Sequence, residues 1–303
     1  MATTTTWNGS ASDGNWDTAS NWTNGVPNTD STAIIDGAVS ITGGLPTNEE
    51  VERVFVAYTY TGALGSSGSP LRLDCAQFSY DSNTLSPTSY VHIIGVENTT
   101  PDILVDGLKT GSALVLSGVL DRLSIETTFA GQLTLGNNAT YQAIPKDMYM
   151  LSSTGSVTAP VKANIAWASG GTTHIAGGLV TIAENFGASA NVILSGGTLN
   201  VTDWTLTTGD SLTVLGGNCT WNAGASSFST TLQNTIRTIN VISGTFSLAS
   251  NTYGHVEFEN IYQWGGTVNL ESSYANVVIK TAYERFAGTY VPPKQSSIST
   301  APL

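Results

Sequence analysis

Residues 195–201 read Ser-Gly-Gly-Thr-Leu-Asn-Val, and residues 215–221 repeat the pattern as Leu-Gly-Gly-Asn-Cys-Thr-Trp. In both stretches the second glycine is followed by one variable residue and then by an apolar, a polar and an apolar residue. The same frame follows Gly178, Gly244 and Gly266, and successive glycines lie 19 to 27 positions apart. A period of that length, with alternation that puts apolar side chains on one face of a short strand, is typical of one coil of a β-solenoid.

The frame also predicts which side chains point inward, because successive residues of a strand face opposite sides. The expected inward pairs are Val180/Ile182, Leu199/Val201, Cys219/Trp221, Phe246/Leu248 and Val268/Leu270. The polar residues between them, expected to face outward, are Thr181, Asn200, Thr220, Ser247 and Asn269. Upstream, the frame fits Gly111 with Ala113/Val115, Gly131 with Leu133/Leu135 and Gly155 with Val157/Ala159.

We therefore expect an all-β fold, a right-handed, single-stranded parallel β-helix. A β-sandwich is the alternative, because it also has short alternating strands separated by turns. The near-constant register of glycine relative to the apolar pair favours the solenoid.

Composition excludes several classes of partner. Hydrophobic residues make up 40% of the 303-residue chain, enough to fold, whereas charged residues make up only 11%. The formal net charge is −12, with 15 of the 22 acidic residues before residue 150 and no block of Lys or Arg. Nucleic acid and anionic membranes are therefore not expected as partners. No apolar run approaches the 18 residues of a membrane-spanning segment.

The chain divides into three predicted segments. Residues 1–36 contain three tryptophans among Gly, Asn and Asp turn formers, which suits a compact cap over the open end of a solenoid. Residues 37–282 are the predicted β-helix. Residues 283–303 lack alternation and are predicted to form an extended C-terminal arm that is pinned against another surface.

The first segment carries a resemblance to known proteins. Its motifs are Trp7-Asn8-Gly9, Gly14-Asn15-Trp16, Asn21-Trp22, Gly25-Val26-Pro27-Asn28 and, further on, 60–65 with 70–73. They resemble the N-terminal segment of β-helical proteins of bacteriophage virions, and autotransporter-type passenger proteins carry a similar segment. No secretion signal is visible in residues 1–7, which favours the phage group over a secreted adhesin.

The resemblance implies a structural, non-enzymatic virion protein made in the host cytoplasm. The specific expectation is an accessory capsid decoration or cement protein on the outer capsid surface. Its partners would be the major capsid protein and its own copies, as a homotrimer. The alternative is a tail-associated or surface β-helix that binds or depolymerises carbohydrate.

Interaction residues are expected at the two ends of the chain, and no catalytic, cofactor-binding or metal-binding residue is predicted. The expected set is Trp7, Trp16 and Trp22 in the cap, with Arg285, Phe286, Tyr290, Pro292 and Pro293 in the arm.

The carbohydrate alternative rests on paired acids and on aromatic residues. Glu257 and Glu259 are two residues apart and would share one strand face, and Glu184 and Asp203 are 19 apart and could stack on neighbouring coils. Glycoside hydrolysis needs two such carboxyl groups. The tryptophans considered for sugar binding are Trp167, Trp204, Trp221 and Trp264, with Trp221 expected in the core.

Metal and thiol chemistry have weaker signals. Asp13, Asn15 and Asp17 have the opening spacing of a calcium loop, but the glycine and the bidentate acid of that loop are missing. The histidines His92, His174 and His255 are scattered, and His174 is expected to face outward. Cys75 and Cys219 are expected to be buried and unpaired, with a disulfide between them as the alternative.

Overall fold

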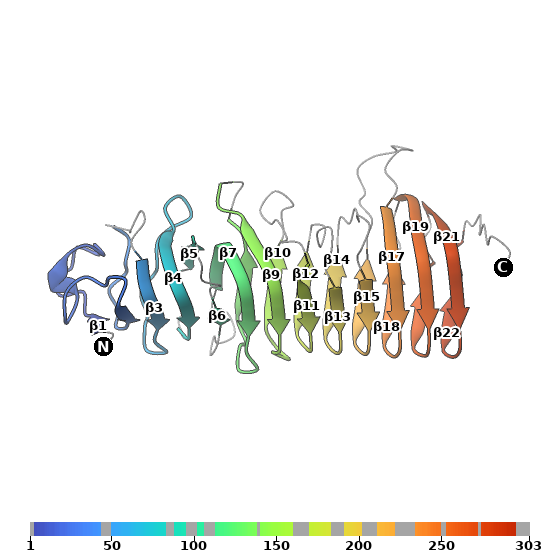
Figure 1. Cartoon of the computed structure of the whole chain (residues 1–303), viewed down its shortest axis with the longest axis horizontal. Coiled ribbons are helices and arrows are strands. Elements are labelled where there is room, and N and C mark those ends of the chain that lie inside the picture. Colours follow the sequence, from blue (N-terminus) through green and yellow to red (C-terminus); the bar gives the residue numbers. More distant parts are fainter. Residues whose placement is uncertain are drawn as a thin grey trace. The chain divides into compact units, whose positions relative to one another are not determined.

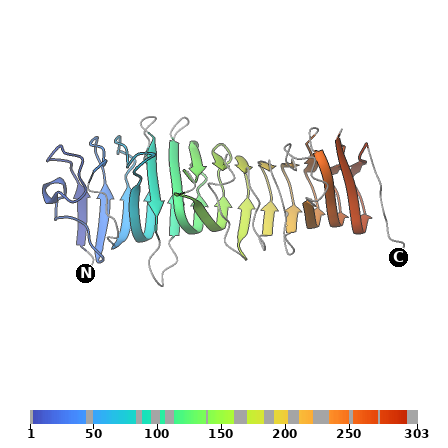
Figure 2. The same ribbon diagram turned by 90° about the horizontal axis from the view of Figure 1, so that it is seen from above.

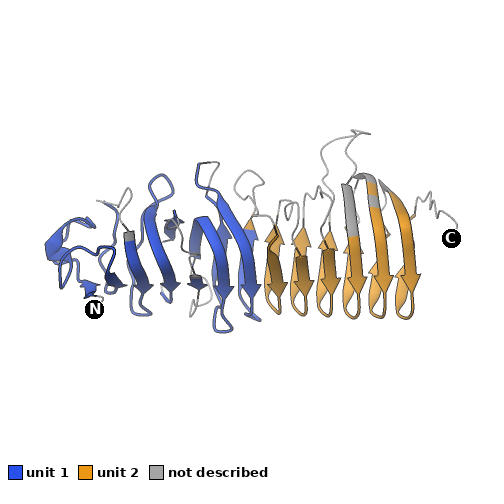
Figure 3. Cartoon of the chain, viewed as in Figure 1, with its two compact units in different colours: residues 1–158, 163–166 blue, residues 159–162, 167–303 orange. Residues whose placement is uncertain are grey.

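The computed structural model describes residues 3–43, 50–82, 88–94, 102–105, 113–137, 140–159, 170–182, 191–201, 211–221, 234–249, 253–271 and 274–294. The fold is all-β, a parallel β-solenoid of about 8 turns, which confirms the predicted fold class. In the described ranges the one helical element is a single 3-10 turn, η1 (Ala19–Asn21). Contacts divide the chain into two units, residues 1–158 with 163–166 and residues 159–162 with 167–303 (Figure 3).

The strands of the first part of the chain are β1 (Thr3–Trp7), β2 (Ser31–Ile35), β3 (Glu50–Val56), β4 (Leu71–Tyr80), β5 (Ser89–Ile93), β6 (Asp102–Val105), β7 (Ala113–Ile125), β8 (Gln132–Leu135), β9 (Ala143–Met150) and β10 (Ser156–Ala159). Those of the second unit are β11 (Thr172–Ile175), β12 (Leu179–Ile182), β13 (Asn191–Leu194), β14 (Thr198–Val201), β15 (Ser211–Val214), β16 (Asn218–Trp221), β17 (Asn234–Val241), β18 (Thr245–Leu248), β19 (Tyr253–Gln263), β20 (Thr267–Asn269), β21 (Tyr274–Arg285) and β22 (Thr289–Val291).

The second unit consists of two ladders, and within each ladder parallel strands lie side by side (Figures 1 and 2). One ladder pairs β11, β13, β15, β17, β19 and β21 in that order, and the other pairs β12, β14, β16, β18, β20 and β22. Each strand therefore pairs with the strand one coil further along the chain. This is the arrangement that a repeating glycine turn predicts.

The first unit has the same parallel pairing with longer strands. Strand β7 takes part in two sets of pairings within this unit. Its first half pairs with β5 and β8, and its second half pairs with β6 and β9. Between the halves lies Gly118, with φ of +92°. β1 and β2 within the predicted cap already pair in parallel, so that segment contributes strands as well as loops.

The core lies between the ladders and is made of the predicted inward side chains. All ten residues of the five downstream pairs are buried, and so are Leu133, Leu135, Val157 and Ala159. At the Gly111 repeat the prediction was wrong by one residue, because Leu114 and Leu116 are buried and Ala113 and Val115 are not. A shift of one residue turns every side chain of a strand to its other face.

The predicted arm begins with paired strands. β21 extends to Arg285, and Thr289 in β22 pairs with Thr267 in β20. Gly288 has φ of +91°, so the glycine turn occurs once more at residues 286–288. Residues 295–303 lie outside the described part of the chain.

Candidate interaction surface

A row of exposed apolar side chains lies at one corner of the second unit. Leu215, Ile242, Trp264 and Phe286 occupy the same place in successive coils, immediately before the short glycine turns. Their exposed fractions are 41%, 48%, 52% and 58%. The turns at the ends of β15, β17, β19 and β21 lie along the lower edge of Figure 1. We call these four residues the apolar ridge.

Backbone hydrogen bonds hold the ridge residues in register. The N–H of each ridge residue donates to a carbonyl of the preceding coil at 2.8 Å, and the four acceptors are Leu194, Val214, Val241 and Gln263. Where the turn is Gly-Gly or Ser-Gly, the N–H of the residue after the ridge residue donates to the same carbonyl. The four side chains therefore leave the solenoid from equivalent backbone positions, one per coil.

Trp264 and Phe286 are stacked on each other. Their ring centroids are 4.2 Å apart and their planes differ by 10°. Both rings remain more than half exposed. Each ring therefore covers one face of the other, and each keeps its edge and its second face.

The predicted interaction residues near the C-terminal end differ in exposure. Arg285, Phe286 and Pro292 are exposed, Tyr290 is half-buried and Pro293 is buried. The Tyr290 ring lies 4.7 Å from the ring of Tyr283. Phe286 is thus the member of the predicted set that belongs to the ridge, and its stacking partner Trp264 had been considered for sugar binding alone.

Tyr283 is tied to the core through one buried amide. The Tyr283 hydroxyl donates to Gln263 Oε1 at 2.7 Å, and Gln263 Nε2 donates to the carbonyl of Thr289 at 2.9 Å. Burial raises the pKa of Tyr283 to about 12, with the neighbouring Tyr290 adding to the shift. These bonds join β19, β21 and β22, and Gln263 directly precedes the ridge residue Trp264 in the chain.

The three tryptophans of the cap form a buried cluster. Trp22 packs edge-to-face against Trp7 and Trp16, with ring centroids 5.2 and 4.7 Å apart. Trp7 Nε1 donates to the Val39 carbonyl at 3.0 Å, and Trp22 Nε1 donates to the Trp16 carbonyl at 2.7 Å. All three rings are at most 3% exposed, so their contacts in this chain are internal. Their proposed role in binding a partner stays a prediction.

The loop considered for calcium is a set of side-chain turns. Asp13 accepts hydrogen bonds from the Asn15 N–H, the Thr18 hydroxyl and the Asn21 amide, and these donors lower its pKa in that order. The Asp17 N–H donates in turn to Asn15 Oδ1. The oxygens that would face a cation therefore face protein donors. Among the described residues, no group of three His, Cys, Asp or Glu is placed to hold a metal ion.

The acid pairs proposed for sugar chemistry are only partly visible. Glu257 and Glu259 lie on β19, where the register against β21 shifts between Phe258 and Asn260. Phe258 and Ile261 are both buried, so strict alternation ends at this point of the strand. Glu184, Asp203, Trp167 and Trp204 lie outside the described residues, and so do the side chains of Glu257 and His255.

The remaining histidines and the cysteines occupy separate places. His92 Nδ1 lies 3.0 Å from Ser117 Oγ, and burial followed by the charge of Arg72 lowers its pKa. His174 faces outward, as predicted, with Nε2 2.9 Å from Ser195 Oγ. Cys75 and Cys219 are free and buried, which confirms that prediction.

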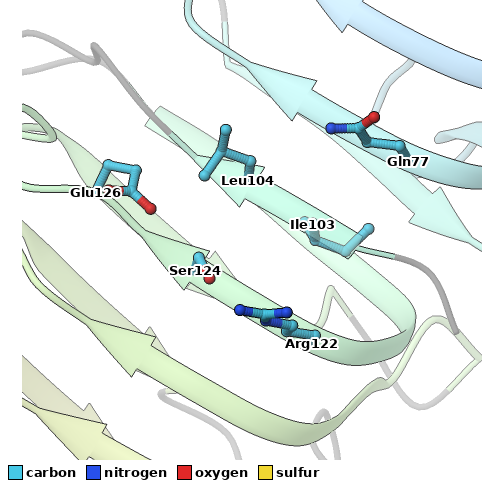
Figure 4. A pocket seen from close by; sticks show the side chains of 6 residues that line it. All are labelled: Gln77, Ile103, Leu104, Arg122, Ser124 and Glu126. Atoms are coloured by element: carbon cyan, nitrogen blue, oxygen red, sulfur yellow. The ribbon is translucent and has the colours of Figure 1, made fainter.

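A shallow pocket of about 240 Å³ lies on the outside of the first unit (Figure 4). It is lined by Gln77, Ile103, Leu104, Arg122, Ser124 and Glu126, from β4, β6 and β7 with the residue after β7. In the β-ladder Arg122 pairs with Asp102 on one side and Asp147 on the other. The Arg122 guanidinium also lies 6.0 Å from the centre of the Tyr149 ring. The lining combines an amide, a hydroxyl, a cation and an acid, groups that bind polar hydroxyl-rich ligands.

Comparison with protein-family models, curated proteins and solved structures finds no match to this chain. No helix in the described ranges has the length and hydropathy needed to cross a bilayer. The fold is therefore established by the geometry of the chain itself.

Proposed function

We propose that this chain is a structural, non-enzymatic virion protein, an accessory decoration protein on the outer capsid of a bacteriophage. The observation that carries the proposal is the uniform outer face of the second unit. The outward residues Thr181, Asn200 and Thr220 lie in register on successive coils, as do Ser247 and Asn269. Such a row presents hydroxyl and amide groups and contains no acid–base pair for catalysis, as expected of a structural face. The resemblance of the tryptophan-rich segment to phage β-helical proteins supports the same reading.

The proposed partner is the major capsid protein, contacted through the first unit. That unit carries 15 acidic and 5 basic residues, whereas the second carries 7 acidic and 5 basic residues. A strongly acidic surface steers association with a basic one and makes binding sensitive to salt. We expect the recipient surface on the capsid to be basic.

Particle localisation tests the proposal. The chain is expected in purified virions, at symmetry-related positions on the capsid in a particle reconstruction. Its absence from virions, or its confinement to tail tips, would overturn the decoration role.

A binding assay tests the proposed contact. Capsids lacking the protein should rebind it less tightly when the exposed Asp17 and Asp30 are changed to Lys, and less tightly in high salt. The matched control is Glu284→Lys, at an exposed position in the second unit. Equal weakening by the control would show that the first unit is not the docking side.

The Arg122 pocket favours one second candidate, a carbohydrate-binding or depolymerising role on host surface polysaccharide. This role predicts binding to specific polysaccharides that is lost in Arg122→Ala, and oligosaccharide release that stops in Glu257→Gln or Glu259→Gln. Failure to bind or cleave any member of a capsule panel would retire this candidate.

A further inference from the structure

We propose that the apolar ridge is the surface through which two copies of this chain pack together, side by side and antiparallel. The ridge is Leu215, Ile242, Trp264 and Phe286, as defined above. This inference goes beyond the proposed capsid role and does not depend on it, because it concerns the isolated protein, and it proposes a two-fold dimer in place of the homotrimer that the resemblance implies.

The first step is the size and character of the ridge. Four side chains that are 41% to 58% exposed form a continuous row, one per coil. Their combined exposed area is roughly 400 Å², within the range of patches that are functional on soluble proteins. A standard interface buries about 800 Å² per partner with an apolar centre and a polar rim. The ridge supplies that centre, and the Thr and Asn residues after each turn supply a rim.

The second step is the orientation of the aromatic rings. The Trp264 and Phe286 rings each cover one face of the other, so the area open for stacking on a sugar ring is reduced by one face per ring. The remaining exposed parts of the two rings continue the apolar row of Leu215 and Ile242 along the coils. An apolar strip of this form fits another apolar strip better than it fits a sugar ring.

The charges of the two units favour a contact along the second unit. All four ridge residues are uncharged, and the second unit as a whole has 7 acidic and 5 basic residues, so repulsion between two second units is small. The first unit, with 15 acidic and 5 basic residues, would repel its own copy. A second copy is therefore accommodated along the second unit. A strongly charged partner would gain nothing from this surface.

The order of side chains along the ridge favours an antiparallel pair. The exposed fraction rises from Leu215 to Phe286, and the two larger, aromatic side chains both lie at the Phe286 end of the row. Antiparallel packing places Leu215 opposite Phe286 of the second copy and Ile242 opposite Trp264 of the second copy, so large side chains meet smaller ones along the whole strip. Parallel packing would place the aromatic side chains of the two copies against each other at one end of the ridge. At the other end it would leave a gap between the smaller aliphatic side chains. The two-fold axis then lies between the coils of Ile242 and Trp264.

Sedimentation equilibrium of the purified full chain tests the association. The wild-type protein should be a reversible dimer, and Trp264→Ser should raise its dissociation constant about 30-fold or more, the effect of losing one interface hot spot. Phe286→Ser should act in the same direction. The control is Leu179→Ser, which removes an exposed apolar side chain of the second unit outside the ridge and should leave the dissociation constant unchanged. A wild-type monomer at every concentration, or equal weakening by the control, would overturn the proposal.

Disulfide trapping tests the orientation. Leu215→Cys and Phe286→Cys are made as separate variants, mixed and mildly oxidised. Antiparallel packing predicts that the mixed 215–286 cross-link forms fastest. The buried Cys75 and Cys219 should not contribute. Faster 215–215 and 286–286 links, which a parallel dimer or a cyclic trimer would form, would overturn it. The capsid experiments above neither support nor weaken this result.

Discussion

Gly197 and Gly217 are successive members of one backbone ladder in the second unit. The Gly197 carbonyl oxygen accepts a hydrogen bond from the Asn218 N–H at 2.9 Å. The same oxygen lies 2.5 Å from the point that a Cβ on Gly217 would occupy. Gly217 also has φ of +70°. Glycine is thus required twice here, by the backbone conformation and by the approach of the preceding coil.

Replacing Gly217 with alanine should destabilise the second unit strongly. The positive φ alone costs about 1–2 kcal/mol for a residue with a Cβ, and the clash with the Gly197 backbone adds to it. We expect a total loss above about 2 kcal/mol in urea unfolding. The control is Gly170→Ala, because Gly170 has φ of +76° but nothing within 4 Å of its Cβ position. Equal losses in the two variants would show that coil-to-coil contact does not contribute.

The tryptophan cluster should respond unequally to two similar substitutions. Trp22 Nε1 donates to the Trp16 carbonyl at 2.7 Å, whereas the buried Trp16 Nε1 has no hydrogen-bond partner among the described residues. Trp22→Phe removes that bond and leaves a buried carbonyl short of a donor. Trp16→Phe removes a donor that is already unsatisfied. We expect Trp22→Phe to cost about 1–2 kcal/mol more in free energy of unfolding. A Trp16→Phe variant that is as unstable as Trp22→Phe would contradict this explanation.

Stability should fall at alkaline pH, and the two buried cysteines should cause part of that fall, beside buried tyrosines such as Tyr60 and Tyr80 whose pKa is also raised by burial. Burial raises the pKa of Cys75 and Cys219 from 9.0 to about 12, with Asp74 adding to the shift at Cys75. Well below pH 9 the thiols are protonated in both the folded and the unfolded chain. Between 9 and 12 the unfolded chain loses protons that the folded chain keeps, so unfolding becomes easier. Each thiol should contribute about 1.4 kcal/mol per pH unit in this window.

The urea midpoint between pH 8 and pH 11 measures this effect. Cys219→Ala and Cys75→Ala should each reduce the slope, although both lose some stability at pH 8 from the smaller side chain. An unchanged slope in both variants, or rapid thiol labelling of the native protein, would contradict the burial argument.

Short-range pattern was sufficient for most of the fold. The glycine turn and the alternation after it identified the buried pairs from Val180 to Leu270, because turn conformation and strand facing depend on neighbouring residues. The pattern failed at Ala113 and Val115, where the chain enters the 13-residue β7. In that strand several apolar residues follow one another, and Leu114 and Leu116 face the core. Local composition cannot choose between two registers when both faces carry apolar residues.

The apolar ridge was missed, although the residue before each glycine turn can be read in the sequence. Leu215, Ile242, Trp264 and Phe286 are 22 to 27 residues apart in neighbouring pairs, and each alone is an ordinary exposed or buried apolar residue. Trp221 lies at the end of the strand that follows a glycine turn and is fully buried. Trp264 directly precedes a glycine turn and is half exposed.

The sequence by itself determined the repeating coil, its parallel β class and the inward side chains of the second unit, because turns and alternation are local properties. Only the tertiary structure decided that residues from four coils meet at one corner and that two of their rings stack. Stacking of coils brings together residues that are distant in the chain, and the register of each coil on the next sets what the solenoid presents to a partner.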